Sequence, residues 1–446
     1  MRPLTIIQTA VLSITLFLSL NLFSQQPTFQ VSGKNLLAPN GENFIIRGIN
    51  YPILDHGDID FTNHSQFEYY IDQAAMTGAN AIRISWNTDG VHWRDNTATG
   101  GAPGTLNSYI TNGHLDALLS YCESKHLVTI LDIHDLTCSD DWAAFNSIVI
   151  PFWQSNAVQT LIANHQANLI INLSNETGIV RWGPGSQATA LTNYTIIYID
   201  AIQSLRSLGI NVPIMIDAPD CGQSSSEMLS VSESINAADS LHNVIFSAHA
   251  YWGGYATTLS EIQTKLDEAQ NTNVCFVLGE IANNQDNNTC GDLDLSAIYP
   301  LVLQEACTRN IGWLAWTYEL DCSATRQMTT DGNFANLTAY GNDIVNNPNY
   351  GLKSIGNCGA FPVSISEEVK SKSSITISQN STSGSFIIHS SEAAQRISAL
   401  DVLGKELALI SEGNNSYRLV NPQTGMYFIQ IETTIGTSVS RKFIVN

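Results

Sequence analysis

The feature that most constrains this chain is a succession of eight short apolar runs, spaced at intervals of roughly 30 to 50 residues. In order they read NFIIRGIN, ANAIRISW, LVTILDIHD, LIINLSNE, VPIMIDAPD, NVIFSAHAY, NVCFVLGE and IGWLAWTYE. Runs of this length and hydrophobicity are typical of strands buried on both faces. The segments between them, such as 64–79 and 192–210, have apolar residues at helical spacing and end near a glycine that can cap a helix.

Eight parallel strands with crossover helices form a closed barrel, so the sequence predicts an α/β fold of the (β/α)8 or TIM-barrel class over residues 26–357. A doubly wound open sheet is the alternative, but the count of eight and the polar ends of the strands argue against it. The chain has 446 residues, of which 43% are hydrophobic, and this is enough for a large domain and a small one.

The composition and the hydrophobic pattern of the sequence change after about Gly359. The segment SEEVKSKSSITISQNSTSGS is rich in Ser and Thr, so we expect a linker over residues 358–374, and the short alternating runs of 375–446 predict a small all-β sandwich. The segments NPQTGMYFIQI and SRKFIVN resemble the C-terminal sorting domain of the type IX secretion system of Bacteroidetes bacteria. That resemblance implies the type IX secretion machinery as a partner. A carbohydrate-binding module is the alternative, although this segment contains no Trp to stack on a sugar.

Residues 1–24 are typical of a signal peptide, because Arg2 is followed by a short apolar run and Ser24 precedes the expected cut. A membrane-tethered N-terminus is the alternative. Together with the C-terminal segment, this pattern predicts a protein that is secreted or held at the cell surface.

Export permits disulfides among the eight cysteines, and we expect the pairs Cys275–Cys307 and Cys290–Cys322. No CxxC pair occurs, so a zinc site is poorly supported. We also expect no cofactor.

The formal net charge of -21 excludes several kinds of partner. A chain with this negative charge repels phosphate backbones, and we therefore do not expect it to bind nucleic acid. Polyanionic substrates are disfavoured for the same reason. A neutral substrate fits better, and we expect a monomer.

Polar or aromatic residues stand where each apolar run ends. Active sites of barrels are built at this C-terminal end of the strands, so these residues are expected to converge. Two of them, Glu176 at the end of the fourth run and Glu280 at the end of the seventh, are expected to face one another across the barrel mouth. Paired carboxylates on either side of a glycosidic bond hydrolyse sugars, and a separation of about 5 Å makes one of them a nucleophile and retains the anomeric configuration.

With these residues in place, the chain resembles glycoside hydrolase family 5 over roughly residues 40 to 345. The match rests on LSNETG, VLGEIA and AIRISW, which carry Glu176, Glu280 and Arg83. The resemblance implies that Glu176 is the acid/base, that Glu280 is the nucleophile and that Arg83 keeps Glu280 ionised. The other residues that it assigns to substrate binding are Asn175, beside the sugar 2-OH, His134, His249, Tyr251 and Trp316.

Several segments, among them VTILDIHDLTC and VIFSAHAYWGGY, look most like the bacterial β-mannanases of subfamily 8. Mannan or glucomannan is therefore the expected substrate. The chain departs from that pattern at Ile281-Ala282, where those enzymes usually have Phe-Gly, and at Thr177-Gly178, where an aromatic residue usually follows the acid/base. An endo-β-1,4-glucanase and a non-catalytic glycan-binding protein on the same fold are the alternatives.

Four further aromatic residues follow strand ends, and for each a sugar contact and simple packing are both open: Trp93, Trp142, Trp182 and Trp252. We include Trp252 among the substrate-binding residues. Asp217 and Asp220 follow the fifth run, and we expect them to cap the next helix rather than to contact sugar.

Overall fold

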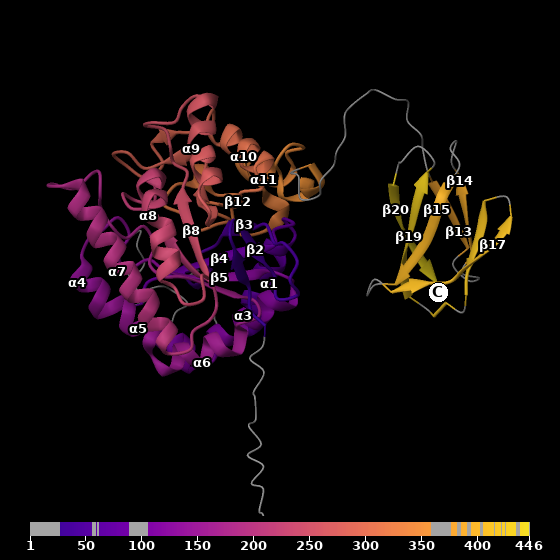
Figure 1. Ribbon diagram of the computed structural model, residues 1–446, viewed down its shortest axis with the longest axis horizontal. Coiled ribbons are helices and arrows are strands. Elements are labelled where there is room, and N and C mark those ends of the chain that lie inside the picture. The colour runs from indigo at the N-terminus through magenta and orange to yellow at the C-terminus, as the bar shows by residue number, and fades with distance from the viewer. Residues whose placement is uncertain are drawn as a thin grey trace, which may run out of the picture. The chain divides into compact units, whose positions relative to one another are not determined.

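The computed structural model describes residues 27–55, 59, 62–88, 106–357 and 376–445, the last with gaps at 381–384, 390–393, 402–404, 414, 421, 424 and 434–437. The chain divides into two compact units, 1–362 and 363–446 (Figure 1). The predicted signal peptide and linker lie outside the described residues. Within the described part of the chain, no helix has the length and hydrophobicity to cross a membrane.

The first unit contains a closed barrel of eight parallel strands, which confirms the predicted TIM barrel. The strands are hydrogen-bonded in the order β12-β3-β4-β5-β6-β7-β8-β9. Their bounds are β3 (Arg47–Asn50), β4 (Ala81–Trp86), β5 (Val128–Ile133), β6 (Leu169–Asn172), β7 (Ile214–Asp217), β8 (Val244–His249), β9 (Cys275–Ile281) and β12 (Gly312–Ala315).

Helices surround the barrel (Figure 1). They are α1 (His64–Ala75), α2 (Leu106–Thr111), α3 (His114–Ser124), α4 (Trp142–Ala144), α5 (Ile150–Gln154), α6 (Asn156–His165), α7 (Gln187–Ser207), α8 (Ser225–Ala238), α9 (Leu259–Asn271), α10 (Tyr299–Thr308) and α11 (Ala339–Asn346). A π-helical turn, η2 (Phe145–Val149), and the 3-10 segments η1 (Ile53–Asp55), η3 (Ala324–Arg326), η4 (Phe334–Asn336) and η5 (Leu352–Asn357) complete the set. Local sequence fixes several helix starts: Thr258 and Glu261 form a capping box on α9, and Ser155 caps α6.

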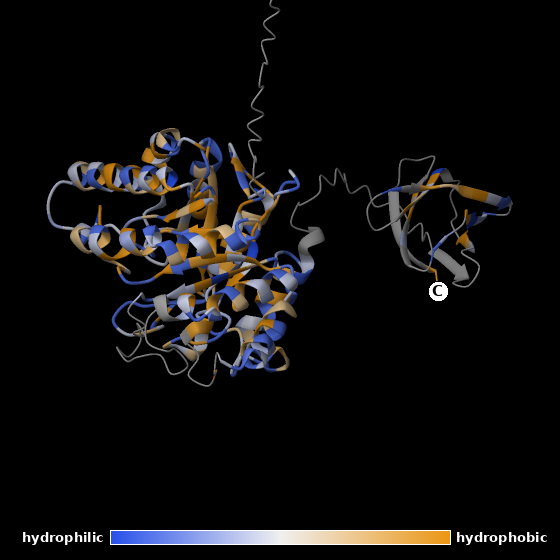
Figure 2. Ribbon diagram, turned by 90° about the horizontal axis from the view of Figure 1, so that it is seen from below, coloured by the Kyte–Doolittle hydropathy of each residue, from blue (hydrophilic) through white to orange (hydrophobic). Residues whose placement is uncertain are grey.

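Alternation along the strands divides the barrel interior into an apolar and a polar layer. Side chains of successive strand residues point to opposite faces, so every second residue faces inward. Near the N-terminal ends of the strands the inward layer is apolar and includes Ile130, Ile170 and Met215, which share one buried cluster with Phe29 and Leu36 from the hairpin β1 (Gln30–Ser32) and β2 (Asn35–Leu37). Figure 2 shows the strands of the barrel as largely hydrophobic.

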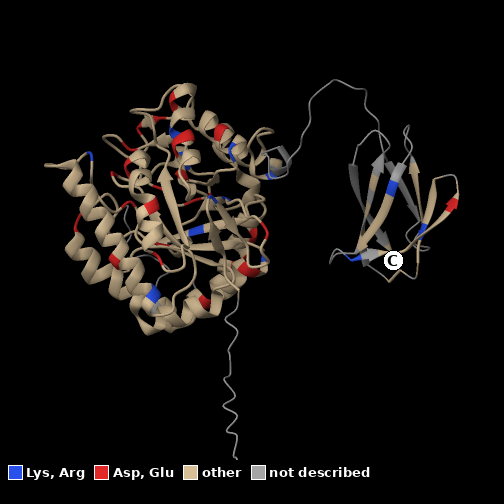
Figure 3. Cartoon of the chain, viewed as in Figure 1, with Lys and Arg blue, Asp and Glu red and all other residues tan. Residues whose placement is uncertain are grey.

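Two residues further along the same strands, the inward side chains are polar. Asp132 follows Ile130, Asn172 follows Ile170 and Asp217 follows Met215, and all three are fully buried. The C-terminal half of the barrel is therefore a polar compartment enclosed by an apolar wall. Acidic residues are scattered along the helices and loops of this unit (Figure 3), in keeping with the net charge of -21.

The second unit consists of two antiparallel sheets of four strands, as the sequence predicts for a small all-β region. One sheet has the order β13-β14-β18-β17 and the other β16-β15-β19-β20. The bounds are β13 (Thr376–Asn380), β14 (Ser385–His389), β15 (Ala394–Asp401), β16 (Glu406–Leu407), β17 (Leu409–Gly413), β18 (Ser416–Leu419), β19 (Gly425–Thr433) and β20 (Ser438–Val445). Phe386, Ile388, Ile429 and Ile431 belong to a single buried cluster, so this unit has its own core.

Candidate active site

Glu176 and Glu280 lie close together at the C-terminal end of the barrel. Glu280 is in β9, and Glu176 follows β6 by four residues. One carboxylate oxygen of Glu176, one of Glu280 and a ring nitrogen of His249 all lie within 4.8 Å of one another. Glu176 has a φ of 50°, a left-handed conformation that non-glycine residues adopt rarely.

Both oxygens of Glu280 are held by buried donors. Arg83 donates from Nη1 to Oε1 at 2.8 Å, and the Tyr251 hydroxyl donates to Oε2 at 2.8 Å. Burial alone would raise the pKa of Glu280, but the positive charges of His249 and Arg83 outweigh it and lower that pKa. Burial and the charge of Glu280 raise the pKa of Tyr251 well above 10, so its hydroxyl remains a donor. Glu280 is thus fixed as a carboxylate.

Arg83 is the centre of a buried polar network beneath the two glutamates. Its Nη2 lies 2.9 Å from Asp132 and 3.5 Å from Asp217, in addition to the contact with Glu280. Burial would lower the pKa of Arg83, but these three carboxylates raise it further above its usual value. Its remaining N–H groups donate to the amide oxygens of Asn50, Asn172 and Asn175. The guanidinium therefore connects β4, which carries it, with β3, β5, β6, β7 and β9.

His249 links the two glutamates. Its Nδ1 lies 2.6 Å from Oε1 of Glu176 and 3.4 Å from Oε2 of Glu280, and its Nε2 lies 3.6 Å from Asp217. Burial opposes the charged ring, but the charges of Glu280 and Asp217 raise the pKa of His249 to about 10. His249 is consequently protonated at neutral pH, and its Nδ1–H donates to Glu176.

Glu176 is shifted in the opposite direction from Glu280. Burial is the largest influence and raises the pKa of Glu176; His249 lowers it, and the charges of Glu280 and Asp217 raise it further. The outcome is a raised pKa for Glu176 and a lowered pKa for Glu280. Two carboxyl groups whose environments separate their pKa values are suited to different roles, one as a proton donor and one as an anion.

A cleft of about 320 Å³ opens above these groups. Among the described residues it is lined by His134, Thr137, Cys138, Asn175, Glu176, Trp182, Cys221, Gln223, Tyr251, Glu280, Gln285, Asp286, Trp316 and Arg326. Trp316 is held by a 2.9 Å hydrogen bond from Nε1 to Asp321, and its ring is stacked on His134 with 15° between the planes. His134 in turn contacts Asp132 through Nε2 at 2.5 Å. The cleft thus offers an aromatic face beside the two carboxylates.

The structure brings most of the predicted substrate-binding residues to this place. His134, Asn175, Tyr251 and Trp316 line the cleft, whereas Arg83 and His249 are fully buried behind the glutamates. Trp252 does not fit the prediction. Its side chain is fully buried in the main hydrophobic core and is not among the described residues that line the cleft, so its role is packing.

The helix-capping prediction for two aspartates is wrong. Asp217 faces into the barrel, where it contacts Arg83 and accepts a hydrogen bond from the backbone N–H of Glu176 at 3.2 Å. Asp220 accepts hydrogen bonds from the backbone N–H groups of residues 180–182 and from the hydroxyl of Ser224. Both carboxylates therefore hold the loops of the site and do not act on the first turn of α8.

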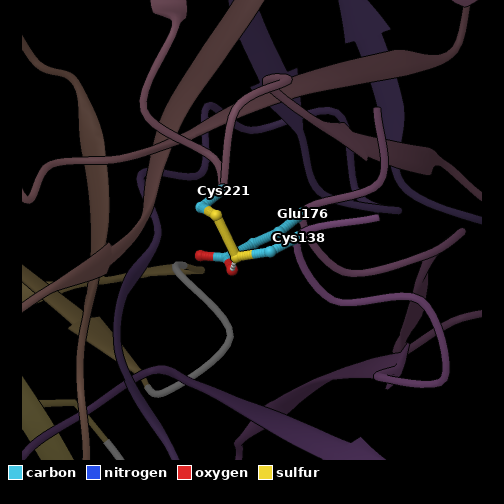
Figure 4. A group of neighbouring side chains, drawn as sticks. All are labelled: Cys138, Glu176 and Cys221. Atoms are coloured by element: carbon cyan, nitrogen blue, oxygen red, sulfur yellow. Dashed lines mark hydrogen bonds between the residues drawn. A yellow bond between two sulfur atoms is a disulfide. The ribbon is translucent and has the colours of Figure 1, made fainter. Parts of the chain in front are cut away.

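The disulfides differ from the prediction in one pair. Cys290–Cys322 is present, as expected. Cys275 is a free thiol, so the pair Cys275–Cys307 is wrong: Cys275 points into the barrel interior, whereas Cys307 packs among residues outside it. A bond between Cys138 and Cys221, which the sequence did not suggest, joins two loops beside Glu176 (Figure 4).

Asp132 and Asn172 belong to the site but were not predicted from the sequence. Both lie inside an apolar run and not at its end. The available signal was their alternation: Asp132 stands two residues before His134, and Asn172 stands two residues after Ile170, so each shares the inward face of its strand.

The comparisons with known proteins agree with this geometry. The family model described as cellulase (glycosyl hydrolase family 5) matches residues 37–321, which is more than half of the chain. The chain belongs to glycoside hydrolase family 5. It is therefore a glycoside hydrolase, and this bears out the resemblance drawn from LSNETG, VLGEIA and AIRISW.

Several relatives have been named for their activity. A mannan endo-1,4-β-mannosidase of Cellvibrio japonicus (strain Ueda107) is 28% identical over 77% of this chain and 72% of its own length. Another of the same name, from Salipaludibacillus agaradhaerens, is 27% identical over 71% of this chain and 90% of its own length. The solved mannohexaose complex of a Thermomonospora fusca β-mannanase shares the fold, with a TM-score of 0.57 at 21% identity over 74% of this chain and 97% of that one.

Proposed function

We propose that this family 5 member is a secreted, retaining endo-β-1,4-mannanase that cleaves mannan or glucomannan by double displacement. The observation that carries the proposal is the pair Glu176 and Glu280, whose carboxylate oxygens approach within 4.8 Å and whose pKa values are shifted in opposite directions. Carboxyl groups about 5 Å apart are typical of retaining enzymes, whereas inverting enzymes leave roughly 6.5–9.5 Å for a water molecule.

In the first step, Glu280 attacks the anomeric carbon while Glu176 gives its proton to the leaving glycosidic oxygen. The groups around Glu280 favour this role: Arg83 and Tyr251 hold its two oxygens and keep it ionised. The burial of Glu176 favours the protonated form that a general acid needs. The products of this step are a glycosyl ester on Glu280 and the shortened polysaccharide chain.

In the second step, Glu176 is a carboxylate and takes a proton from water, which attacks the anomeric carbon and releases Glu280. His249 remains in contact with Glu176 and provides a positive charge beside the new carboxylate. The anomeric configuration is inverted twice and is therefore retained.

Asn175 is placed to position the sugar. Its Oδ1 accepts a hydrogen bond from Arg83 and its Nδ2 donates to Thr137 at 2.9 Å, so the orientation of the amide is fixed. An amide NH₂ has two hydrogens, and the second remains for the substrate. We assign it to the 2-OH of the sugar at the cleavage point, with Trp316 beneath the ring.

The choice of mannan rests on the two relatives named mannan endo-1,4-β-mannosidases and on the segments that resemble subfamily 8. Ile281-Ala282 and Thr177-Gly178 depart from that subfamily close to the glutamates, which keeps a β-glucan as the second candidate. A structural neighbour from Saccharophagus degradans, 16% identical and with a TM-score of 0.53, is titled β-glucanase, so proteins of both names have this fold.

Incubation of the full chain with linear mannan, glucomannan, galactomannan and carboxymethyl-cellulose, followed by measurement of new reducing ends, tests the substrate. We expect cleavage of the mannans and not of the cellulose derivative. Activity on the cellulose derivative alone would assign the protein to the glucanases, and no activity on any of the four would contradict both candidates.

The roles of the two glutamates are tested by Glu176→Gln and Glu280→Gln, with Glu319→Gln as the matched control. Glu319 is also buried near the end of β12, where it accepts a hydrogen bond from Tyr51, but it is not among the described residues that line the cleft. We expect at least about a hundredfold loss of kcat in the first two variants, as is typical for loss of acid/base or covalent catalysis, and most activity in the control. Proton NMR of the first product, before mutarotation, is expected to show the β-anomer.

Export is part of the proposal. It is supported by the pattern of residues 1–24, by the resemblance of 375–446 to a type IX sorting domain and by two disulfides in the described residues, which form in oxidising compartments. In a bacterium with a type IX system, deletion of residues 375–446 is expected to trap the enzyme in the periplasm. Equal amounts outside the cell with and without this segment would contradict the assignment.

A further inference from the structure

The Cys138–Cys221 disulfide lies against the proposed acid/base. It connects the loop after β5 with the loop after β7, and Figure 4 shows it beside the Glu176 carboxyl group. The Sγ atom of Cys138 is 3.2 Å from Oε2 of Glu176. A disulfide sulfur carries no hydrogen and is only a weak acceptor, so a hydrogen bond at this contact requires a protonated carboxyl as its donor.

The contact is asymmetric with respect to the two oxygens of Glu176. Oε1 faces the protonated ring of His249, which favours the ionised carboxylate. Oε2 faces an uncharged, polarisable sulfur that offers no hydrogen bond to an anion. This side of the carboxyl group therefore favours the proton that a general acid must carry.

The backbone around the disulfide has an unusual conformation. Glu176, Cys138, Asp220 and Cys221 all have a positive φ, between 50° and 59°. Left-handed geometry is sterically unfavourable for a non-glycine residue, so four such residues in contact need strong constraints to hold them. The covalent bond between the two loops is one constraint, and the hydrogen bonds that Asp220 accepts from residues 180–182 are another.

The loop that carries Cys221 also fixes His249. The carbonyl of Gly222 accepts a 2.7 Å hydrogen bond from the backbone N–H of His249. A Cβ atom at Gly222 would lie 2.5 Å from the imidazole ring, so the loop and the ring are in close contact. The segment 220–222 thus touches both groups that contact the carboxyl of Glu176, the histidine on one oxygen and the disulfide on the other.

We propose that Cys138–Cys221 is a positioning disulfide for the acid/base: it fixes Glu176 in the cleft, keeps water from Oε2 and favours the protonated carboxyl, so that its reduction slows glycosidic cleavage. This inference rests on the proposed role of Glu176 and goes beyond it. Reduction adds two electrons and two protons and gives two thiols, and an external dithiol supplies them and is oxidised to its own disulfide.

The electrostatic setting of Glu176 supports the inference. Burial is the largest influence on its pKa and raises it, and the disulfide is part of the surface that buries Oε2. The charged groups that face Glu176 are His249 from β8, which lowers this pKa, and Asp217 from β7 and Glu280 from β9, which raise it. Other titratable or charged residues along the same cleft are His134, Tyr251, Asp286 and Arg326. Loss of the disulfide admits water to Oε2 and lowers the pKa of Glu176 toward its usual value.

The test uses the full chain with the double substitution Cys138→Ala/Cys221→Ala. Cleavage of the natural bond needs a proton on the leaving oxygen, whereas 2,4-dinitrophenolate leaves without one. We therefore expect kcat/KM on mannan to fall at least about tenfold, a part of the 10²–10⁴-fold that general acid catalysis contributes, with a much smaller fall on 2,4-dinitrophenyl β-mannobioside. Because Glu176 must be protonated for the first step, the alkaline limb of kcat/KM is expected to move to lower pH.

Two reference variants separate the possible failures. Glu176→Ala must show the same dependence on the leaving group, in stronger form; an equal loss on both substrates would overturn the proposed role of Glu176 itself. Cys290→Ala/Cys322→Ala removes the other described disulfide, and it is expected to lower the melting temperature without a shift of the alkaline limb. If Glu176→Ala behaves as expected but the Cys138→Ala/Cys221→Ala enzyme keeps the wild-type alkaline limb and loses both substrates equally, the positioning role is wrong.

A second measurement covers the case in which the double variant does not fold. The wild-type enzyme is treated with dithiothreitol under native conditions, and mass spectrometry of alkylated peptides identifies the cysteines that have been reduced. Loss of mannan cleavage is expected to parallel reduction of Cys138 and Cys221, measured on aliquots quenched with the alkylating reagent, and to reverse when the unalkylated enzyme is reoxidised. Full activity of the enzyme with both residues reduced would overturn the inference.

Discussion

Replacement of Arg83 by Met removes the charge at the centre of the polar network and is expected to change both stability and the pH dependence of catalysis. The guanidinium is fully buried and lies within 3.5 Å of the carboxylates of Asp132, Asp217 and Glu280. Met fills a similar volume without a charge. The variant therefore leaves three carboxylates in the barrel with His249 as the remaining positive charge that contacts Asp217 and Glu280.

The size of the effect follows from the burial. Breaking a buried ion pair by removal of one partner typically costs about 3–5 kcal/mol, because the other charge is left uncompensated. Arg83 has three such partners and also donates to three amide oxygens, so we expect the upper end of that range, about 5 kcal/mol. A domain is typically stable by only about 5–15 kcal/mol, so the loss is large.

The stability loss depends on pH in a defined direction. The pKa values of Glu280 and Asp217 are lowered in the folded wild-type protein, in part by Arg83, so these groups contribute stability above their unfolded pKa that is lost as the pH falls. Without Arg83 this contribution shrinks, and the difference between variant and wild type is expected to be larger at pH 7 than at pH 4. Denaturant unfolding at the two pH values measures it.

Catalysis gives an independent readout. The pKa of Glu280 rises when Arg83 is removed, so the acid limb of kcat/KM is expected to move to higher pH. Arg206→Met is the matched control: Arg206 is nearly buried and pairs with Asp239 through two contacts of 2.9 Å, but it lies where α7 approaches the N-terminal end of the barrel. It is expected to lose stability and to keep the wild-type acid limb.

A third variant separates loss of the positive charge of Arg83 from a general disturbance of the fold. Arg83→Lys keeps a positive charge near Glu280 but cannot reproduce the planar fork of donors. We expect an acid limb close to that of the wild type and a reduced kcat/KM. If Arg83→Met and Arg206→Met lose equal stability and both keep the acid limb, Arg83 does not control the ionisation of Glu280 and the reasoning is refuted.

Four other substitutions test separate parts of the barrel unit. His249→Gln removes a charge that lowers the pKa of both glutamates, so both limbs of the kcat/KM profile are expected to move to higher pH; an unmoved profile would contradict the protonated ring. Gly222→Ala places a Cβ 2.5 Å from His249 at a φ of 73°, and it is expected to cost about 1–3 kcal/mol in denaturant unfolding and to lower kcat. Trp182→Ala removes a half-exposed ring from the cleft and is expected to raise KM roughly fivefold, for about 1 kcal/mol, at unchanged stability, whereas Trp252→Ala is expected to cost about 3–5 kcal/mol of stability. The reverse pattern for the two tryptophans would mean that Trp252, and not Trp182, contacts the substrate.

The barrel could be predicted from the sequence because its strands are buried on both faces and therefore appear as continuous apolar runs. The glutamates could be predicted because a carboxylate at the end of such a run is costly unless it has a use, and Glu176 and Glu280 both stand there. The order of the polar strand ends then matched a known family. These signals are local in the sequence, so they can be recognised without any knowledge of tertiary contacts.

The groups that tune the glutamates could not be predicted in the same way. Asp217 ends an apolar run like Glu176, but whether it caps a helix or faces Arg83 depends on the direction of its side chain in the closed barrel. Trp252 follows a strand end as Trp182 does, yet one is buried and the other lines the cleft. Cys138 and Cys221 are 83 residues apart, and only the approach of the loops after β5 and β7 makes them partners. These outcomes are set by long-range packing.

The charge balance of the network suggests how one carboxyl group can serve as acid and then as base. Before reaction, the charge of Glu280 helps to raise the pKa of Glu176, so that the proton is available for the leaving oxygen. Formation of the glycosyl ester removes that charge from Glu280. The pKa of Glu176 must then fall, because a repulsive neighbour has gone while His249 still lies 2.6 Å from Oε1. In the proposed mechanism the covalent step itself therefore converts Glu176 into the base that the second step requires, and no movement of the chain is needed.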